Sequence, residues 1–224
     1  RNKFLRYKID EKLMKKMIKS KVLSISRRSK YILINLNNHF TIMFHLGMTG
    51  KIIIVGANQN KFKTSFYYKL IDNKPIHDHL ILKFNRDISL IYNDVRKFGF
   101  VKIFKTDKLY LSSHLQKLGP EPLSKKFDFN YFKDYTKKKK IFLKDLLMNQ
   151  KFLSGLGNIY VNEAIFLTKI NPRVKVNNIP IRKIYALVSN IKKVLKKAIK
   201  QGGSSIKNFN NIEGNKGNFQ QFFN

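Results

Sequence analysis

The sequence has no cysteine, few acidic residues and no long hydrophobic run. Without cysteine, the 224 residues hold neither disulfide bonds nor a cysteine-ligated zinc site. No stretch approaches the roughly 18 consecutive apolar residues that cross a membrane, and no signal peptide opens the chain. We therefore expect a cytoplasmic protein that does not enter a membrane.

The acidic residues are heavily outnumbered by basic ones. Asp and Glu number 13 against 46 Lys and Arg, which gives a net charge of +33, while 43% of the residues are hydrophobic. This combination indicates a folded protein with a polyanionic partner. A protein that binds a membrane surface concentrates its lysines on one amphipathic helix or tail, whereas here they run through the whole length. The charge pattern favours nucleic acid over an anionic membrane or acidic proteins.

The first half of the chain shows short apolar or alternating runs separated by polar or glycine turns, a pattern typical of β-strands. The runs span residues 31–36, 41–46, 51–55, 80–84, 88–92 and 100–104. Their hairpin-like spacing predicts an antiparallel sandwich or barrel. A short helical segment at 11–20 precedes them, and a long polar connection at 56–76 interrupts them.

The pattern changes after "LGPEPLS" (118–124), where two prolines mark a linker. Beyond it, helical spacing of apolar residues appears in four segments, 129–140, 141–150, 151–166 and 181–200. The glycine pair at 202–203 is expected to end the last helix. The expected fold class is therefore α+β, with an N-terminal antiparallel β-sandwich domain (1–117) followed by an all-helical domain (118–224).

The string "SGLGNIY" (154–160) places a glycine turn before a helix. Backbone N–H groups at a helix N-terminus form a natural phosphate site, and Asn158 adds a side-chain amide as a cap or phosphate donor. The alternative is a tight helix–helix connection without a ligand. A single G-x-G motif does not decide between the two.

The strings "HLGMTG" (45–50) and "YNDVRKFGF" (92–100) each place an apolar side chain among small or basic residues at a strand end. Met48 stands in the first string, and Phe98 stands close to Arg96 in the second. An arginine beside an exposed aromatic ring is one means by which a protein enters a DNA base stack. The alternative is that Met48 and Phe98 are ordinary core residues.

Other candidate residues are a histidine pair, two basic runs and one acid. His77 and His79 have strand-like spacing, but a metal site needs a third ligand, so phosphate contact or structural hydrogen bonding is the better interpretation. The basic runs at 26–30 and 137–140 fit a solvated surface, unless neighbours lower the pKa of one lysine. Glu163 is either a functional contact or a helix-stabilising charge.

Eight strings, in colinear order from about residue 20 to the end, resemble the formamidopyrimidine-DNA glycosylase family and the related endonuclease VIII group. They are "SRRSKYILINL", "HLGMTG", "HDHLIL", "YNDVRKFG", "LGPEPL", "MNQKFLSGLGNIYVNEAIF", "INP" and "QGGSSIKNF". The resemblance implies a β-sandwich, a helical domain that contains a helix–two-turn–helix, and DNA bound between the two.

The resemblance also implies roles for the residues at matching positions. Lys30 matches a lysine of the β-elimination step, and Met48, Arg96 and Phe98 match side chains that fill the void left by the extruded nucleotide. Other matching positions contact DNA or line the lesion region: His77, Lys139, Lys144, Asn158 and Glu163.

One segment matches the family pattern, and one residue departs from it. Residues 201–219 match a loop that closes over the extruded base. Lys97 stands where an arginine is usual, which keeps the charge but loses the planar fork of donors.

The activity implied by the resemblance is that of a bifunctional DNA glycosylase and AP lyase. The substrate is double-stranded DNA with 8-oxoguanine, formamidopyrimidines or abasic sites. In this family an N-terminal proline amine attacks C1′ and forms a Schiff base, a neighbouring glutamate supplies a proton, and elimination cuts the strand. The sequence contains neither the proline–glutamate start nor the C-terminal zinc finger. We therefore expect a fragment that binds DNA without a cofactor, from a parent protein that holds one zinc ion.

Three alternatives stay open at this point. The chain is a non-catalytic remnant that binds damaged DNA, an endonuclease VIII-like enzyme for oxidised pyrimidines, or a basic protein that associates with RNA through charge alone. For the enzyme we expect a monomer in a bacterial cytoplasm, associated with the nucleoid through its DNA.

Overall fold

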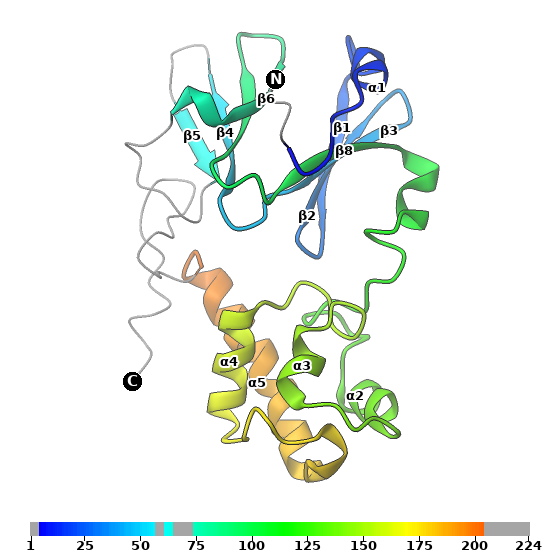
Figure 1. Cartoon of the computed structure of the whole chain (residues 1–224), viewed down its shortest axis with the longest axis vertical. Coiled ribbons are helices and arrows are strands. Elements are labelled where there is room, and N and C mark those ends of the chain that lie inside the picture. The colour runs from blue at the N-terminus through cyan, green and yellow to red at the C-terminus, as the bar shows by residue number, and fades with distance from the viewer. Residues whose placement is uncertain (1–4, 57–60, 65–73, 204–224) are drawn as a thin grey trace. The chain divides into compact units, whose positions relative to one another are not determined.

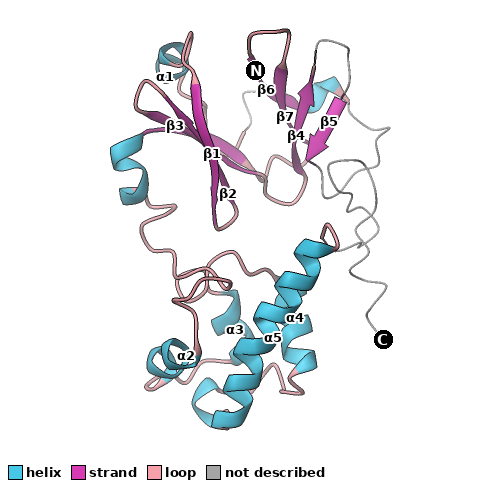
Figure 2. Cartoon of the chain, turned by 180° about the vertical axis from the view of Figure 1, so that it is seen from behind, coloured by secondary structure: helices cyan, strands magenta, loops and turns pink. Residues whose placement is uncertain are grey.

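The computed structural model describes residues 5–56, 61–64 and 74–203. They divide into a β unit, which contains the described residues up to Leu109 and residues 200–203, and a helical unit, which contains residues 110–199 (Figure 1). The predicted boundary at 117/118 is later than the observed one, and residues 200–203, predicted in the helical domain, group with the β unit. Figure 2 shows every strand in the β unit and the long helices in the helical unit.

The described strands form two four-stranded sheets in which all neighbours are antiparallel. The strand orders are β1-β2-β3-β8 and β5-β4-β7-β6. The strands are β1 (Val22–Arg28), β2 (Tyr31–Leu36), β3 (Phe40–His45), β4 (Gly50–Val55), β5 (Lys61–Thr64), β6 (Asp78–Lys83), β7 (Ser89–Asp94) and β8 (Phe100–Lys105). The antiparallel sandwich expected from the sequence is confirmed.

The core of the β unit lies between the sheets because alternate residues of each strand point to the same face. One buried cluster draws on strands of both sheets and on the N-terminal segment; its members are Leu5, Ile9, Ile34, Leu36, Ile42, Phe44, Ile52, Leu90, Tyr92 and Val101. Helix α1 (Glu11–Lys16) precedes the sheets, and the Asp10 carboxylate caps it by accepting the N–H of Leu13 at 3.0 Å.

All six predicted strands are confirmed, and the described residues contain two more, β1 and β5. β1 has no buried residue, and Leu23 and Ile25 are each 68% exposed, so it lacks the alternating burial that reveals a half-buried strand. β5 lies within the predicted polar connection at 56–76, where it pairs with β4. That stretch is therefore not an uninterrupted loop, and its residues 57–60 and 65–73 lie outside the described part of the chain.

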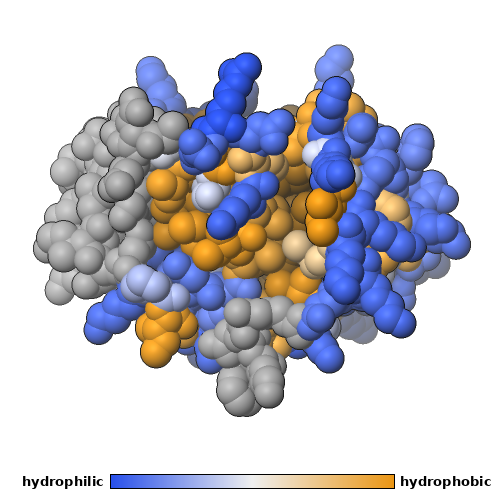
Figure 3. Space-filling model, turned by 90° about the horizontal axis from the view of Figure 1, so that it is seen from above, coloured by the Kyte–Doolittle hydropathy of each residue, from blue (hydrophilic) through white to orange (hydrophobic). Residues whose placement is uncertain are grey.

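The β unit also exposes hydrophobic side chains away from its core. Figure 3 shows such side chains on the face seen from above, bordered by hydrophilic ones. The most exposed in this unit are Ile18, Leu23, Ile25, Ile76 and Ile81. Exposed apolar residues are thus not confined to the loops that carry candidate functional side chains.

The helical unit contains four α-helices among its described residues. They are α2 (Phe129–Thr136), α3 (Leu143–Met148), α4 (Asn158–Leu167) and α5 (Ile181–Lys200). α2 ends before the 137–140 lysine run, which the sequence analysis had included in the helix. α5 agrees with the predicted 181–200 helix, and Gly202 and Gly203 follow it with positive φ angles of 71° and 104°. Short 3-10 turns complete the fold: η1 (Pro75–His77), η2 (Thr106–Leu111) and η3 (Val176–Asn178).

Candidate nucleic-acid interface

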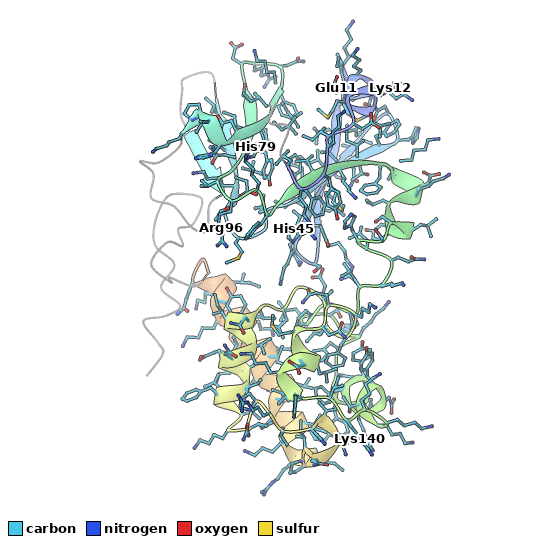
Figure 4. All side chains as sticks on the ribbon, viewed as in Figure 1. Glu11, Lys12, His45, His79, Arg96 and Lys140 are labelled. Carbon is cyan, nitrogen blue, oxygen red and sulfur yellow. The ribbon has the colours of Figure 1, made fainter. Side chains whose placement is uncertain are left out.

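Two loops at one end of the β unit connect its two sheets. Residues 46–49 run from β3 to β4, and residues 95–99 run from β7 to β8. Because β3 pairs with β8 and β4 pairs with β7, the two loops begin and end on paired strands, with His45 opposite Phe100 and Gly50 opposite Asp94. The loops therefore lie side by side, and Figure 4 shows His45 and Arg96 at this end of the unit.

The two loops touch through their backbones. Gly47 has a φ angle of 64°, and a Cβ atom there would lie 2.8 Å from the backbone N of Gly99 and from the carbonyl carbon of Phe98. A Cβ atom at Gly99 would overlap the His45 carbonyl oxygen and the Tyr92 hydroxyl. His45 fixes the first turn by accepting the N–H of Gly47 on Nδ1 at 3.2 Å. Both loops thus need glycine because no side chain fits between them.

The structure brings Met48, Arg96 and Phe98 together on these loops. Met48 and Phe98 are each 46% exposed, so the interpretation of both as core residues is wrong. The guanidinium carbon of Arg96 lies 4.4 Å from the centroid of the Phe98 ring, and an Arg96 terminal nitrogen lies 3.8 Å from the Met48 sulfur. The positively charged guanidinium of Arg96 therefore lies beside an exposed aromatic ring and an exposed thioether.

A buried carboxylate that was not predicted from the sequence supports the loops. Asp94, fully buried at the end of β7, accepts the Thr49 hydroxyl on Oδ1, and on Oδ2 it accepts the Gly99 N–H at 2.8 Å and the Tyr92 hydroxyl at 3.1 Å. The Thr49 hydroxyl in turn accepts the N–H of Arg96 at 3.1 Å. Burial, and then the neighbouring Asp94 charge, raise the pKa of the Tyr92 phenol, which stays a donor. Thr49 and Asp94 stand in two of the quoted motif strings, but sequence alone does not show that these two strings lie in contact.

Lys30 lies at the tip of the β1–β2 hairpin, in a two-residue turn between the paired Arg28 and Tyr31. Ser29, the other turn residue, has a positive φ angle of 56°. Its carbonyl oxygen accepts a hydrogen bond from an Arg27 terminal nitrogen at 2.7 Å. The Lys30 side chain is exposed overall, but desolvation of its amine lowers its pKa. A larger fraction of this amine is neutral at a given pH than of an ordinary lysine, so more of it is available to accept a proton.

The two histidines of "HDH" have different surroundings. His77 ends η1 and is half-buried, whereas His79 is buried and its Nε2 lies 2.8 Å from the carbonyl oxygen of Asp94. Because a carbonyl only accepts, Nε2 carries the proton in this contact. Figure 4 shows His79 within the β unit. His79 therefore has the structural role that the sequence analysis considered, and His77 is the more accessible of the two.

The helical unit contains a turn (149–157) between α3 and α4 that is fixed from within by Gln150. Its Oε1 accepts the N–H of Gly155 at 2.8 Å, and its Nε2 donates to the carbonyl oxygens of Met148 and Leu156 at 3.2 and 3.0 Å. Gly155 has a φ angle of 88°, which favours glycine. This role of Gln150 was not predicted from the sequence, although the residue stands in the longest of the matching strings.

The "LGPEPL" segment packs against the same turn. The Gly119 N–H donates to the Gln150 carbonyl at 2.9 Å, and the Ser154 N–H donates to the Pro120 carbonyl at 2.9 Å. A Cβ atom on Gly119 would lie 2.6 Å from the carbonyl carbon of Phe152. Phe152 and Ser154 are fully buried. The motif read as a linker is therefore also the support of the turn.

Asn158 is the first residue of α4, not its cap. Gly157 occupies the cap position without a side-chain hydrogen bond, so the interpretation of Asn158 as a cap is wrong. The Asn158 side chain is exposed, and its Oδ1 accepts from Asn162 at 3.4 Å. First-turn N–H groups of a helix have no acceptor within the helix. An exposed amide therefore stands beside a helix N-terminus, which suits an anion.

The remaining candidates lie on different parts of the helical unit. Lys139 follows α2, with its Nζ 4.6 Å from the centroid of the Tyr135 ring. Lys144 is on α3, and Glu163 is on the neighbouring α4. Burial raises the pKa of Glu163, and the positive charge of Lys197 opposes this rise.

Two family models match the chain. The formamidopyrimidine-DNA glycosylase N-terminal domain matches residues 1–101, and the formamidopyrimidine-DNA glycosylase H2TH domain matches residues 118–210. The chain belongs to the formamidopyrimidine-DNA glycosylase family. The resemblance drawn from the eight strings is confirmed, and so is the enzyme class, that of a bifunctional DNA glycosylase and AP lyase.

Relatives and solved structures of the family are similar to the chain over most of its length. A formamidopyrimidine-DNA glycosylase of Bartonella tribocorum is 37% identical over 229 residues, which cover 98% of this chain and 77% of the relative. One from Rickettsia conorii is 36% identical over 215 residues, covering 96% and 74%. The Lactococcus lactis Fpg in complex with an abasic site containing DNA has a TM-score of 0.78 and 34% identity, covering 94% of this chain and 73% of that one. MutM in complex with carbocyclic 8-oxo-G containing DNA has a TM-score of 0.75 and 36% identity, covering 88% and 68%.

The described ranges contain no group of three or more His, Cys, Asp or Glu side chains that could hold a metal ion. The zinc finger of the parent protein stays a prediction. Within the same ranges, no helix has the length and hydrophobicity needed to cross a membrane.

Proposed function

We propose that the chain binds duplex DNA at oxidised purines and abasic sites, as the DNA-holding part of a base-excision repair enzyme. The observation that carries this proposal is the exposed contact group of Met48, Arg96 and Phe98 on paired loops. An enzyme that extrudes a nucleotide leaves a gap in the base stack. Apolar side chains fill such gaps, and a neighbouring cation contacts phosphate or a base edge.

The helical unit supplies the second contact in this proposal. The N-terminus of α4 and the Asn158 amide bind a backbone phosphate beside the lesion. His77, Lys139 and the guanidinium of Arg96 make further phosphate contacts, which position the duplex without reading its sequence. Lys144 and Glu163 line the site of the damaged nucleotide.

Strand cleavage in this proposal uses Lys30. An amine with a lowered pKa is neutral more often, so it accepts and returns protons during β-elimination more readily than an ordinary lysine. Base removal through a Schiff base is part of the activity that the family implies. For the described residues we propose that they hold the duplex at the lesion.

DNA substrates are supported by what similar proteins bind. The solved complexes of these similar proteins contain DNA with Fapy-dG, an abasic site or carbocyclic 8-oxo-G. A protein that binds RNA through charge alone needs no exposed ring beside a cation on paired loops. The lesions in the solved complexes favour oxidised purines over oxidised pyrimidines as the substrates of this protein.

The proposal is tested by equilibrium binding of the chain to matched duplexes. One duplex carries a tetrahydrofuran abasic-site analogue, one carries 8-oxoguanine, one is undamaged, and a single-stranded RNA serves as competitor. We expect a preference for both damaged duplexes that persists as salt rises, because the phosphate contacts common to all duplexes weaken equally with salt. Equal affinity for all four nucleic acids would mean that the charge of +33 alone causes binding.

A further inference from the structure

Asp94 and Thr49 have no part in the proposed function so far, yet their side chains join the two exposed loops. We propose that the Asp94–Thr49 pair positions Met48, Arg96 and Phe98 for lesion recognition. This inference rests on the proposed function, because it assumes that those three side chains enter the damaged duplex.

The first link joins the loops through Thr49. A carboxylate only accepts, so the Thr49 hydroxyl donates to Asp94, and its lone pair is left to accept the Arg96 N–H at 3.1 Å. The polarity of this chain of hydrogen bonds is therefore fixed. It connects the backbone of Arg96 to the residue that follows Met48.

The second link holds the far side of the 95–99 loop. The other oxygen of Asp94 accepts the N–H of Gly99 at 2.8 Å, and Gly99 directly follows Phe98. The Asp94 carboxylate is thus bonded directly to Gly99, next to Phe98, and to Thr49, next to Met48. Through Thr49 it is also connected to the backbone of Arg96.

The exposed side chains depend on this backbone support. Met48 and Phe98 are each 46% exposed, so packing fixes them less than it fixes core residues. Asp94, Thr49 and Tyr92 are 0%, 5% and 0% exposed, and hydrogen bonds in such a low-dielectric site are stronger than in water. Side chains that insert into DNA need a rigid support, since small displacements move them out of register with the gap.

The decisive variants change the Thr49 hydroxyl. Thr49→Val keeps the shape but removes both hydrogen bonds, and Thr49→Ser restores the hydroxyl. The matched control is Thr41→Val at the opposite end of β3. Thr41 is also fully buried, and it bonds to Asn35 at 2.8 Å and Thr106 at 3.0 Å, away from the loops.

The measured quantity is the affinity ratio between the abasic-analogue duplex and the undamaged duplex, with the melting temperature of each variant recorded alongside. We expect Thr49→Val to lower this ratio by roughly tenfold, since a broken buried hydrogen bond costs about that in an equilibrium constant. The affinity for undamaged duplex should persist, Thr49→Ser should restore the ratio, and Thr41→Val should lower the melting temperature while keeping the ratio.

Two results would overturn the positioning role while leaving the proposed function in place. One is a selective wild type whose Thr49→Val variant keeps the full ratio. The other is an equal loss of the ratio in Thr49→Val and Thr41→Val, which would reflect a general softening of the sandwich. An unselective wild type is a separate outcome, because it overturns the proposed function and this inference together.

Discussion

Arg96 holds its guanidinium 4.4 Å from the centroid of the Phe98 ring, although both side chains are exposed to solvent. Surface aromatic rings that pair with a cation present an apolar face and a positive charge at the same place. Damaged duplex DNA offers the matching pair of features, a gap in the base stack beside phosphates. This relationship gives the two sheet-connecting loops their proposed function.

Asn158→Ala should weaken binding to the abasic-analogue duplex by about 1–3 kcal/mol, because it removes a hydrogen bond to a phosphate. Titration of a labelled duplex measures the change. The control is Asn162→Ala, one turn further along the same helix, which should have little effect. Unchanged affinity in a folded Asn158→Ala variant would favour the interpretation of the turn as a simple helix connection.

Gly119→Ala should lower the free energy of unfolding by about 1–3 kcal/mol, because the added methyl group overlaps the backbone of Phe152. The shifted turn should also bind the lesion duplex less tightly. Chemical denaturation measures the first effect. Gly56→Ala is the matched control, since its Cβ atom meets nothing within 4 Å. Equal stability of the two variants would show that the turn accommodates a side chain at position 119.

The outline of the fold was predictable because most strands are short apolar runs with buried residues. The run "YILINL" is almost wholly apolar, and β2 occupies the expected residues Tyr31–Leu36, with Leu33, Ile34 and Leu36 buried. β1 was missed because only Leu23 and Ile25 alternate with serines before two arginines end the pattern, and none of its residues is buried. An alternation this short does not stand out from a polar loop in the sequence.

The candidate site was predictable only in part. The eight strings identify Met48, Arg96 and Phe98 one by one. Their contact depends on the pairing of Gly50 with Asp94, on strands that are far apart in the sequence but adjacent in the sheet. That pairing comes from the sheet register, which no single motif contains. The support by Asp94 and Thr49 was therefore invisible until both loops were placed.

Lys30 should react with a trace acylating reagent at lower pH than an ordinary lysine, because desolvation lowers the pKa of its amine and only the neutral amine reacts. Competitive labelling across a pH series, read by peptide mapping, gives the titration midpoint. Lys30→Gln identifies the peptide signal. A midpoint at or above the usual lysine value would remove the support for a role in proton transfer.

Glu163→Gln should stabilise the protein near pH 7 by less than about 1 kcal/mol, a small gain because the side chain is only partly buried. Burial raises the folded-state pKa of Glu163 above its unfolded value. Its ionisation therefore costs stability as pH rises through the folded pKa, and the cost vanishes below the unfolded pKa. Melting temperatures of both proteins should differ at pH 7 and converge at acidic pH. A constant difference across this range would show that charge is not the cause.

The most direct test of lesion recognition by the paired loops is a site-specific photocrosslink from position 98. A benzophenone amino acid replaces Phe98, and a second variant carries it in place of Phe84, which is also exposed but lies between β6 and β7. Both are irradiated on a duplex with one abasic-site analogue. The account predicts that crosslinks from position 98 concentrate on the nucleotides at and opposite the analogue, and that they disperse on undamaged duplex. The same dispersed pattern from both positions on the damaged duplex would contradict it.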